Sequence, residues 1–157
     1  IALVGCAYTF AERGLRLDYD YAVALSNGDR GNAGRLMARA MLSDSRLRWT
    51  APALGTLMGL IPSKSHDHFS SDVMIEASAE MAFDARPVLS QIPVPVLLVG
   101  GDKDFYCPVP LIEDTARMIP DCTLEMYEGK GHAGAIMNRR LAADILAFVN
   151  SKPSTVA

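Results

Sequence analysis

The segment PVLLVGGDKDFYCP, residues 95–108, decides the fold of this chain. It begins with a continuous apolar run, dense in valine and leucine, that ends at Gly100 and Gly101. Apolar residues on both alternating faces are typical of a strand that is covered on both sides, as in a parallel sheet. We therefore predict a buried strand over residues 94–101.

Two further strands are predicted on either side of this segment. IALVG, residues 1–5, is apolar on both faces, whereas TLEMY, residues 123–127, alternates and so indicates a half-exposed strand near a sheet edge. Helical spacing of apolar residues follows the later strands, in LIEDTARMI, residues 111–119, and from Met137 to Val149. This alternation favours an α/β fold with three mostly parallel strands and right-handed crossover helices.

A long insertion separates the first two strands and is too long for a single crossover helix. Its apolar residues recur at helical spacing in NAGRLMARAM, residues 32–41, and in PALGTLMGLI, residues 52–61. CAYTFAERG, residues 6–14, is expected to be a loop, and the prolines of ARPVLSQIPVP, residues 85–95, predict an extended backbone. The expected domains are a core of residues 1–11 and 86–157 and a helical cap of residues 12–85.

Composition narrows the classes of partner. The 157 residues are half hydrophobic and carry a formal net charge of −3 without a basic stripe, which argues against nucleic acid. The apolar runs are too short and too often interrupted to cross a bilayer. A small-molecule substrate fits better. Three cysteines, Cys6, Cys107 and Cys122, have no metal-like pairing, which suits a reducing compartment and predicts a cytoplasmic protein.

Titratable side chains follow two of the predicted strands. Asp102 and Asp104 come directly after residues 94–101, and His132 lies in the turn EGKGHAGA, residues 128–135. In open parallel sheets, ligands gather at the carboxyl ends of the strands, where these loops converge. A carboxylate and an imidazole are therefore expected to meet there, flanked by three further side chains that could shape a pocket: Lys103, Phe105 and Tyr106.

These segments resemble the α/β-hydrolase fold enzymes, among them serine hydrolases and esterases. The resemblance is carried by PVLLVGGDKDFYCP and by the GKGH turn of residues 129–132, and it covers nearly the whole chain, most specifically residues 85–149. It implies that Asp104, rather than Asp102, is the acid that orients His132, and that His132 is the general base. It also implies that IALVGCAYTF is the family's sixth strand followed by the start of the cap.

The resemblance implies a nucleophile as well, on a G-x-S-x-G elbow between an earlier strand and helix. No serine of this chain has that setting. We therefore expect the cap and C-terminal half of an α/β-hydrolase, which holds acid and base without the nucleophile and is inactive alone. The start at Ile1, inside an apolar run, supports a piece of something longer. The substrate is expected to be an ester or similar small, apolar acyl compound, and no cofactor is expected.

Several alternatives stay open from the sequence. Cys6 could replace the nucleophile, although a buried thiol explains it more simply. Asp102 with Asp104 could bind a hard cation and His66 with His68 zinc, but neither pair has further ligands, so no metal is expected. Five methionines could line an apolar pocket, although helix packing explains each more simply: Met37, Met41, Met58, Met74 and Met81.

The rival hypothesis is a non-catalytic module. An apolar strand with an unpaired edge is prone to association, so residues 1–5 are expected to pair with a missing N-terminal half or with a second copy of the chain.

Related chemistries on the same fold use the same acid and base and stay open, namely epoxide opening, dehalogenation, C–C cleavage and perhydrolysis.

Overall fold

A computed structural model describes residues 1–43, 47–60 and 69–151 of the chain. These residues form two compact units, which are described separately below. The core unit comprises Ile1–Thr9 and Asp84–Ala157, and the helical unit comprises Phe10–Phe83.

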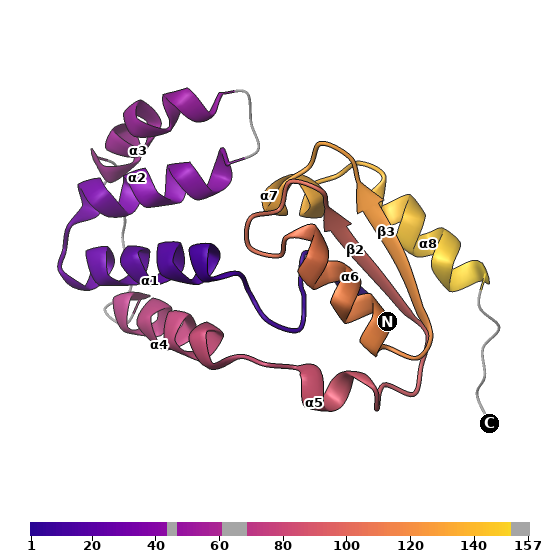
Figure 1. Ribbon diagram of the computed structural model, residues 1–157. Coiled ribbons are helices and arrows are strands. Elements are labelled where there is room, and N and C mark those ends of the chain that lie inside the picture. Colours follow the sequence, from indigo (N-terminus) through magenta and orange to yellow (C-terminus); the bar gives the residue numbers. More distant parts are fainter. Residues whose placement is uncertain (44–46, 61–68, 152–157) are drawn as a thin grey trace. The chain divides into compact units, whose positions relative to one another are not determined.

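The core unit contains a three-stranded parallel sheet of order β1-β2-β3, of which Figure 1 shows β2 and β3 side by side. Leu98 of β2 is level with Leu3 of β1 and with Leu124 of β3. Every pair is parallel, so the predicted α/β fold with crossover helices is confirmed. The elements are β1 (Ala2–Val4), α5 (Arg86–Leu89), β2 (Val96–Gly101), α6 (Val109–Met118), β3 (Cys122–Tyr127), α7 (His132–Ile136) and α8 (Leu141–Ser151).

The central strand β2 is buried along its whole length, as its continuous apolar run predicts. Because successive side chains of a strand point to opposite faces, β2 supplies two hydrophobic clusters. Leu97 and Val99 pack with Tyr127 and with Phe148 of α8, while Val96 packs on the opposite face with residues next to α5 and α6. Helices therefore cover both faces of the sheet (Figure 1).

The outer strands are less buried than β2. Ala2 of β1 is exposed, whereas Leu3 and Val4 pack partly against the two opposite clusters. Within the described residues no strand pairs with the other edge of β1. β3 is half-exposed at the other side of the sheet, as its alternation predicts.

The helical unit is built from helices whose close contacts depend on small residues. Figure 1 shows α2 beside α3 and α1 beside α4. A Cβ on Gly34 of α2 would lie 2.2 Å from the carbonyl oxygen of Gly55 in α3, so the two backbones touch. The elements are α1 (Glu12–Ser26), α2 (Arg30–Met41), the short 3-10 helix η1 (Arg48–Thr50), α3 (Ala51–Leu60) and α4 (Phe69–Ala82).

Several large apolar side chains of the helical unit are exposed. Ala51 and Gly55 are the buried residues of α3, while Leu57 and Leu60 are exposed. The apolar side chains that recur at helical spacing in residues 52–60 therefore do not form the buried face of α3. Of the five methionines, three are half-buried and two are exposed: Met37, Met58 and Met74, then Met41 and Met81.

Three local predictions are wrong. Residues 12–14, expected in a loop, begin the 15-residue helix α1. Residues 86–89, expected to be extended, form α5, because Pro87 lies in the first helical turn, where a proline costs no intrahelical hydrogen bond. The final helix begins at Leu141, so Met137 is 82 % exposed and does not share its buried face.

Membrane insertion through a helix finds no support in the described part of the chain, where no helix combines the length and the apolar character that a bilayer span requires.

Candidate active site

The carboxyl ends of β2 and β3 lie side by side in the core unit. Gly101 at the end of β2 is level with Tyr127 at the end of β3, so the loops that follow them start at the same edge of the sheet. The first loop carries Asp104 and the second leads to His132. His132 is the first residue of α7 rather than part of an open turn, and extended backbone at Gly131 precedes it.

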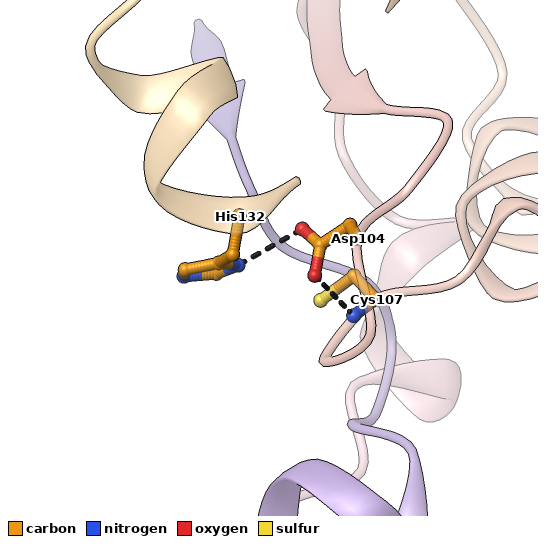
Figure 2. Close-up of side chains that lie close together, drawn as sticks. All are labelled: Asp104, Cys107 and His132. Carbon is orange, nitrogen blue, oxygen red and sulfur yellow. Dashed lines mark hydrogen bonds and ion pairs between the residues drawn. The ribbon is translucent and has the colours of Figure 1, made fainter. Parts of the chain in front are cut away.

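The structure brings the two predicted side chains together (Figure 2). Nδ1 of His132 lies 2.9 Å from Oδ2 of Asp104, which is a hydrogen-bond distance. The Asp104 side chain is fully buried, whereas 28 % of the His132 side chain is exposed. Asp102, the other acid of this loop, is exposed. The imidazole therefore reaches solvent on one side while a buried carboxylate holds it on the other.

Backbone amides fix the orientation of the carboxylate. The N–H groups of Tyr106 and Cys107 donate to Oδ1 of Asp104, at 2.8 and 3.0 Å. Hydrogen bonds to a charged acceptor contribute about 1.5–3 kcal/mol each, so together they hold one orientation strongly. That orientation leaves Oδ2 for His132.

Aromatic side chains of the same loop adjoin the imidazole. The rings of Tyr106 and His132 have centroids 4.9 Å apart and planes inclined by 53°. Phe105 packs on Tyr106 with centroids 4.2 Å apart. Lys103 contributes through its backbone, because its N–H donates to the carbonyl oxygen of Lys130 at 2.9 Å. Thus the tyrosine contacts the imidazole, whereas the lysine ties the two loops together.

Glycines permit the close approach of these loops. A Cβ on Gly101 would lie 2.1 Å from the carbonyl oxygen of Lys130, a distance that no side chain tolerates. Gly5, just after β1, has φ of +63°, and its Cβ would lie 3.3 Å from Cε1 of His132. The ends of all three strands therefore meet around the imidazole.

Replacing Gly101 by alanine is expected to lower the free energy of unfolding by about 1–3 kcal/mol, because the added methyl group would meet a backbone oxygen. Urea unfolding followed by circular dichroism measures the change. The matched control is Gly31→Ala, since a Cβ on Gly31 meets only ordinary contacts at 3.8 Å. A Gly101 variant as stable as the parent would show that the two loops can separate freely.

Cys107 is a member of this site that the sequence analysis did not single out. Its side chain is completely buried, and its Sγ lies 3.6 Å from the carbonyl oxygen of Gly5. Burial, and next the charge of Asp104, raise the pKa of the Cys107 thiol far above its ordinary value. Burial also raises the pKa of the Cys6 thiol, which lowers the thiolate fraction that a nucleophile needs. The only sequence signal for Cys107 was its place three residues after Asp104.

Ligand-type side chains also gather here. One ligand atom each from Asp104, Cys107 and His132 lies within 4.8 Å of the others. Asp102, which together with Asp104 was the alternative hard-cation pair from the sequence, is not part of this group. His66 and His68 lie outside the described residues.

An open cavity of about 570 Å³ lies next to the second loop. Its lining includes Lys130, Arg139 and Arg140, but none of the three ligand-type side chains named above. The cavity therefore adjoins the loop that leads to His132 and includes neither Asp104 nor His132 in its lining.

No protein-family model matches the chain, and no curated protein matches it. Several solved structures, however, are similar to the chain. MGS-M2, an α/β-hydrolase enzyme from a Medee basin deep-sea metagenome library, matches with a TM-score of 0.73 at 12 % identity over 97 % of this chain and 56 % of its own. The hydrolase olei00960 from Oleispira antarctica matches with a TM-score of 0.68 at 15 % identity, over 97 % of this chain and 56 % of its own.

A third similar structure is the esterase EaEST from Exiguobacterium antarcticum, with a TM-score of 0.64 at 20 % identity, over 95 % of this chain and 56 % of its own. The chain thus spans a little over half the length of the structures that it matches. Together with the parallel sheet and its crossover helices, these matches show that the chain has the fold of the C-terminal part of an α/β-hydrolase.

Proposed function

We propose that this chain supplies the acid, Asp104, and the general base, His132, of a nucleophile–histidine–acid triad that hydrolyses an ester or a similar small acyl substrate. The observation that carries the proposal is the 2.9 Å contact between a buried, doubly anchored carboxylate and a partly exposed imidazole. Both groups follow the carboxyl ends of adjacent parallel strands, where α/β enzymes gather their ligands.

Each group has a defined task in this mechanism. Nε2 of His132 takes the proton of the nucleophile's hydroxyl group as that oxygen attacks the acyl carbon, and returns it to the leaving alkoxide. Asp104 accepts the hydrogen bond from Nδ1–H, which fixes the tautomer and stabilises the imidazolium that forms. Water then cleaves the acyl intermediate with the same base. These steps need no cofactor.

The nucleophile, a serine in this proposal, belongs to the part of the fold that the chain does not span. The matched structures are longer, since the chain covers 56 % of them. We expect this chain alone not to turn over esters, because no serine of the chain lies in a G-x-S-x-G elbow. The helical unit takes the role of the cap.

The substrate is inferred to be apolar. The helical unit exposes large apolar side chains, among them Trp49, Leu57 and Leu60, and α3 carries no charged residue. Esterase chemistry is favoured because one of the matched structures is an esterase. We place the protein in the cytoplasm, because its three cysteines are free thiols, as a reducing compartment keeps them.

The test is hydrolysis of p-nitrophenyl esters of increasing acyl length by the polypeptide that contains this chain together with the nucleophile-bearing part of the fold. Turnover that rises with acyl length and disappears with His132 is the expected result. Turnover that does not depend on His132 would remove the proposal.

A second candidate function is an assembly module, favoured by the open edge of β1. The Ile1 carbonyl accepts from Leu97 N–H, and Gly5 N–H donates to the Val99 carbonyl, at 2.9 Å each. In a parallel ladder alternate residues face the same neighbour, so the N–H of Ala2 points to the other edge. That edge of β1 can pair with a strand from the N-terminal part of the fold or with a strand from a second copy of this chain.

Replacing Ala2 by proline is expected to convert an associating chain into a monomer, because proline removes the N–H that the open edge offers and leaves the β1–β2 bonds in place. Sedimentation velocity over a concentration series measures the change. Ala2→Ser, which keeps the backbone N–H at the same exposed position, is the control. A parent chain that stays monomeric at every concentration would argue against this function.

A further inference from the structure

The acid–base pair shares its surroundings with a thiol. One ligand atom each from Asp104, Cys107 and His132 lies within 4.8 Å of the others, and Figure 2 shows the three side chains close together, with Asp104 and Cys107 on the loop after β2 and His132 at the start of α7. Carboxylate, thiolate and imidazole are all zinc ligands, and thiolate selects soft cations over magnesium or calcium. We propose that these three side chains bind one thiophilic divalent cation, Zn²⁺ or Cd²⁺, and that binding switches the base off.

The spacing suits such an ion after a small movement. Zinc–sulfur and zinc–nitrogen bonds of about 2.3 and 2.0 Å put tetrahedral ligands about 3.5 Å apart. Nδ1 of His132 and Oδ2 of Asp104 are 2.9 Å apart, so they must separate by roughly half an ångström as the ion takes the place of the shared hydrogen. A water completes the four ligands.

The protons and charges balance. The Cys107 thiol releases its proton to solvent and binds as a thiolate, Asp104 binds as a carboxylate, and His132 binds as neutral imidazole. The charges of the two anions cancel that of the dication, which favours the complex in a buried site. At a pH at which the free imidazole is already neutral, one proton is released for each ion bound.

Inhibition follows from the tautomer, and this part rests on the proposed function. When Nδ1 binds the ion, the single proton of the neutral ring lies on Nε2. A protonated Nε2 has no lone pair with which to accept the nucleophile's proton. The ion also replaces the hydrogen bond with which Asp104 orients the base.

Backbone contacts support the ligand set. Oδ1 of Asp104 is held by the N–H groups of Tyr106 and Cys107, so the carboxylate is already oriented, as outer contacts orient ligands in known metal sites. The Cys107 thiol is confined between the end of β1 and the same loop, with its Sγ next to the Gly5 carbonyl. The carboxylate is therefore already oriented, while the sulfur, within 4.8 Å of the other two ligand atoms, moves with the imidazole to reach separations of about 3.5 Å.

Cadmium titration of the purified chain tests binding without any need for catalysis. The thiolate-to-cadmium charge-transfer absorption in the ultraviolet is expected to saturate at one ion per chain, with one proton released per ion to a pH indicator. In Cys107→Ser and Cys107→Val, affinity measured against a competing chelator should fall by at least about 100-fold, since even losing an outer contact costs 10–100-fold. Cys122→Ser, at a half-exposed thiol outside the cluster, is the control.

Two results would overturn the site: equal cadmium affinity in the parent and in both Cys107 variants, or a charge-transfer band that is lost with Cys122 instead. Circular dichroism of each variant confirms that it is folded. In the active polypeptide, Zn²⁺ should inhibit the parent at concentrations at least about 100-fold below those needed for Cys107→Ser, each relative to its own metal-free rate. Binding that leaves ester turnover unchanged would contradict the base role of His132 and leave the metal site intact.

Discussion

Replacing His132 by alanine is expected to lower kcat for ester hydrolysis about a million-fold, the cost of removing the base from a comparable triad. Alanine has no group that can take the proton of the attacking hydroxyl, and the buried Asp104 loses its hydrogen-bond partner. KM is expected to change little, because the base acts on the nucleophile rather than on the bound acyl group. Stopped assays with a p-nitrophenyl ester measure both constants.

The matched control is His66→Ala, the same substitution outside the described residues, which should keep the parent rate. Added imidazole should restore part of the turnover of the His132 variant, because a small base can occupy the space that the ring leaves. A merely structural role would show as a loss of stability without such rescue. A His132 variant that retains more than about a hundredth of the parent kcat would contradict the role of the base.

Replacing Asp104 by asparagine is expected to lower kcat about ten-thousand-fold. The amide can still accept the N–H groups of Tyr106 and Cys107, so the loop should keep its shape. Its NH₂ group would face Nδ1 of His132, however, and would favour the tautomer in which Nε2 carries the proton. The pH dependence of kcat/KM in both proteins separates this loss from unfolding.

Asp102→Asn is the control for this variant, since it makes the same change two residues away at an exposed acid. It should stay within about twofold of the parent rate, because a solvated surface charge affects a distant group weakly. A loss of similar size in both variants would mean that the charge of the loop matters and that the contact with His132 does not.

The central strand could be predicted from the sequence because its signal is local. A continuous apolar run marks a strand buried on both faces, and the structure places β2 there, fully buried from Val96 to Gly101. A contact between a carboxylate after β2 and His132 could be expected because parallel strands end at the same edge, whereas the choice of Asp104 over Asp102 came from the resemblance to the α/β-hydrolases. The distance between the Asp104 and His132 side chains, and the amides that hold the carboxylate, depend on the backbone of residues 101–107 and have no pattern in the sequence.

The helical unit shows why other features of the structure could not be predicted from the sequence. The buried residues of α1 are Gly14, Ala22 and Ala24, so its buried face carries no large apolar side chain that would reveal a helical period. Cys107 could not be linked to His132 from the sequence, because no motif marks a thiol at that position of the loop. Contacts made by small residues, or across long separations, leave no short-range signal.

In most helix pairs, large side chains both hold the helices together and determine the surface that they present. The backbone contact between α2 and α3 separates these two properties. Gly34, Gly55 and Gly59 let the helices touch without side chains between them, so the leucines of α3 do not hold the pair together. Evolution can therefore exchange Leu57 or Leu60 for residues of other size or polarity while the architecture of the pair stays constant. The outward face of α3, and the molecules that it contacts, can therefore change in evolution while the fold is inherited unchanged.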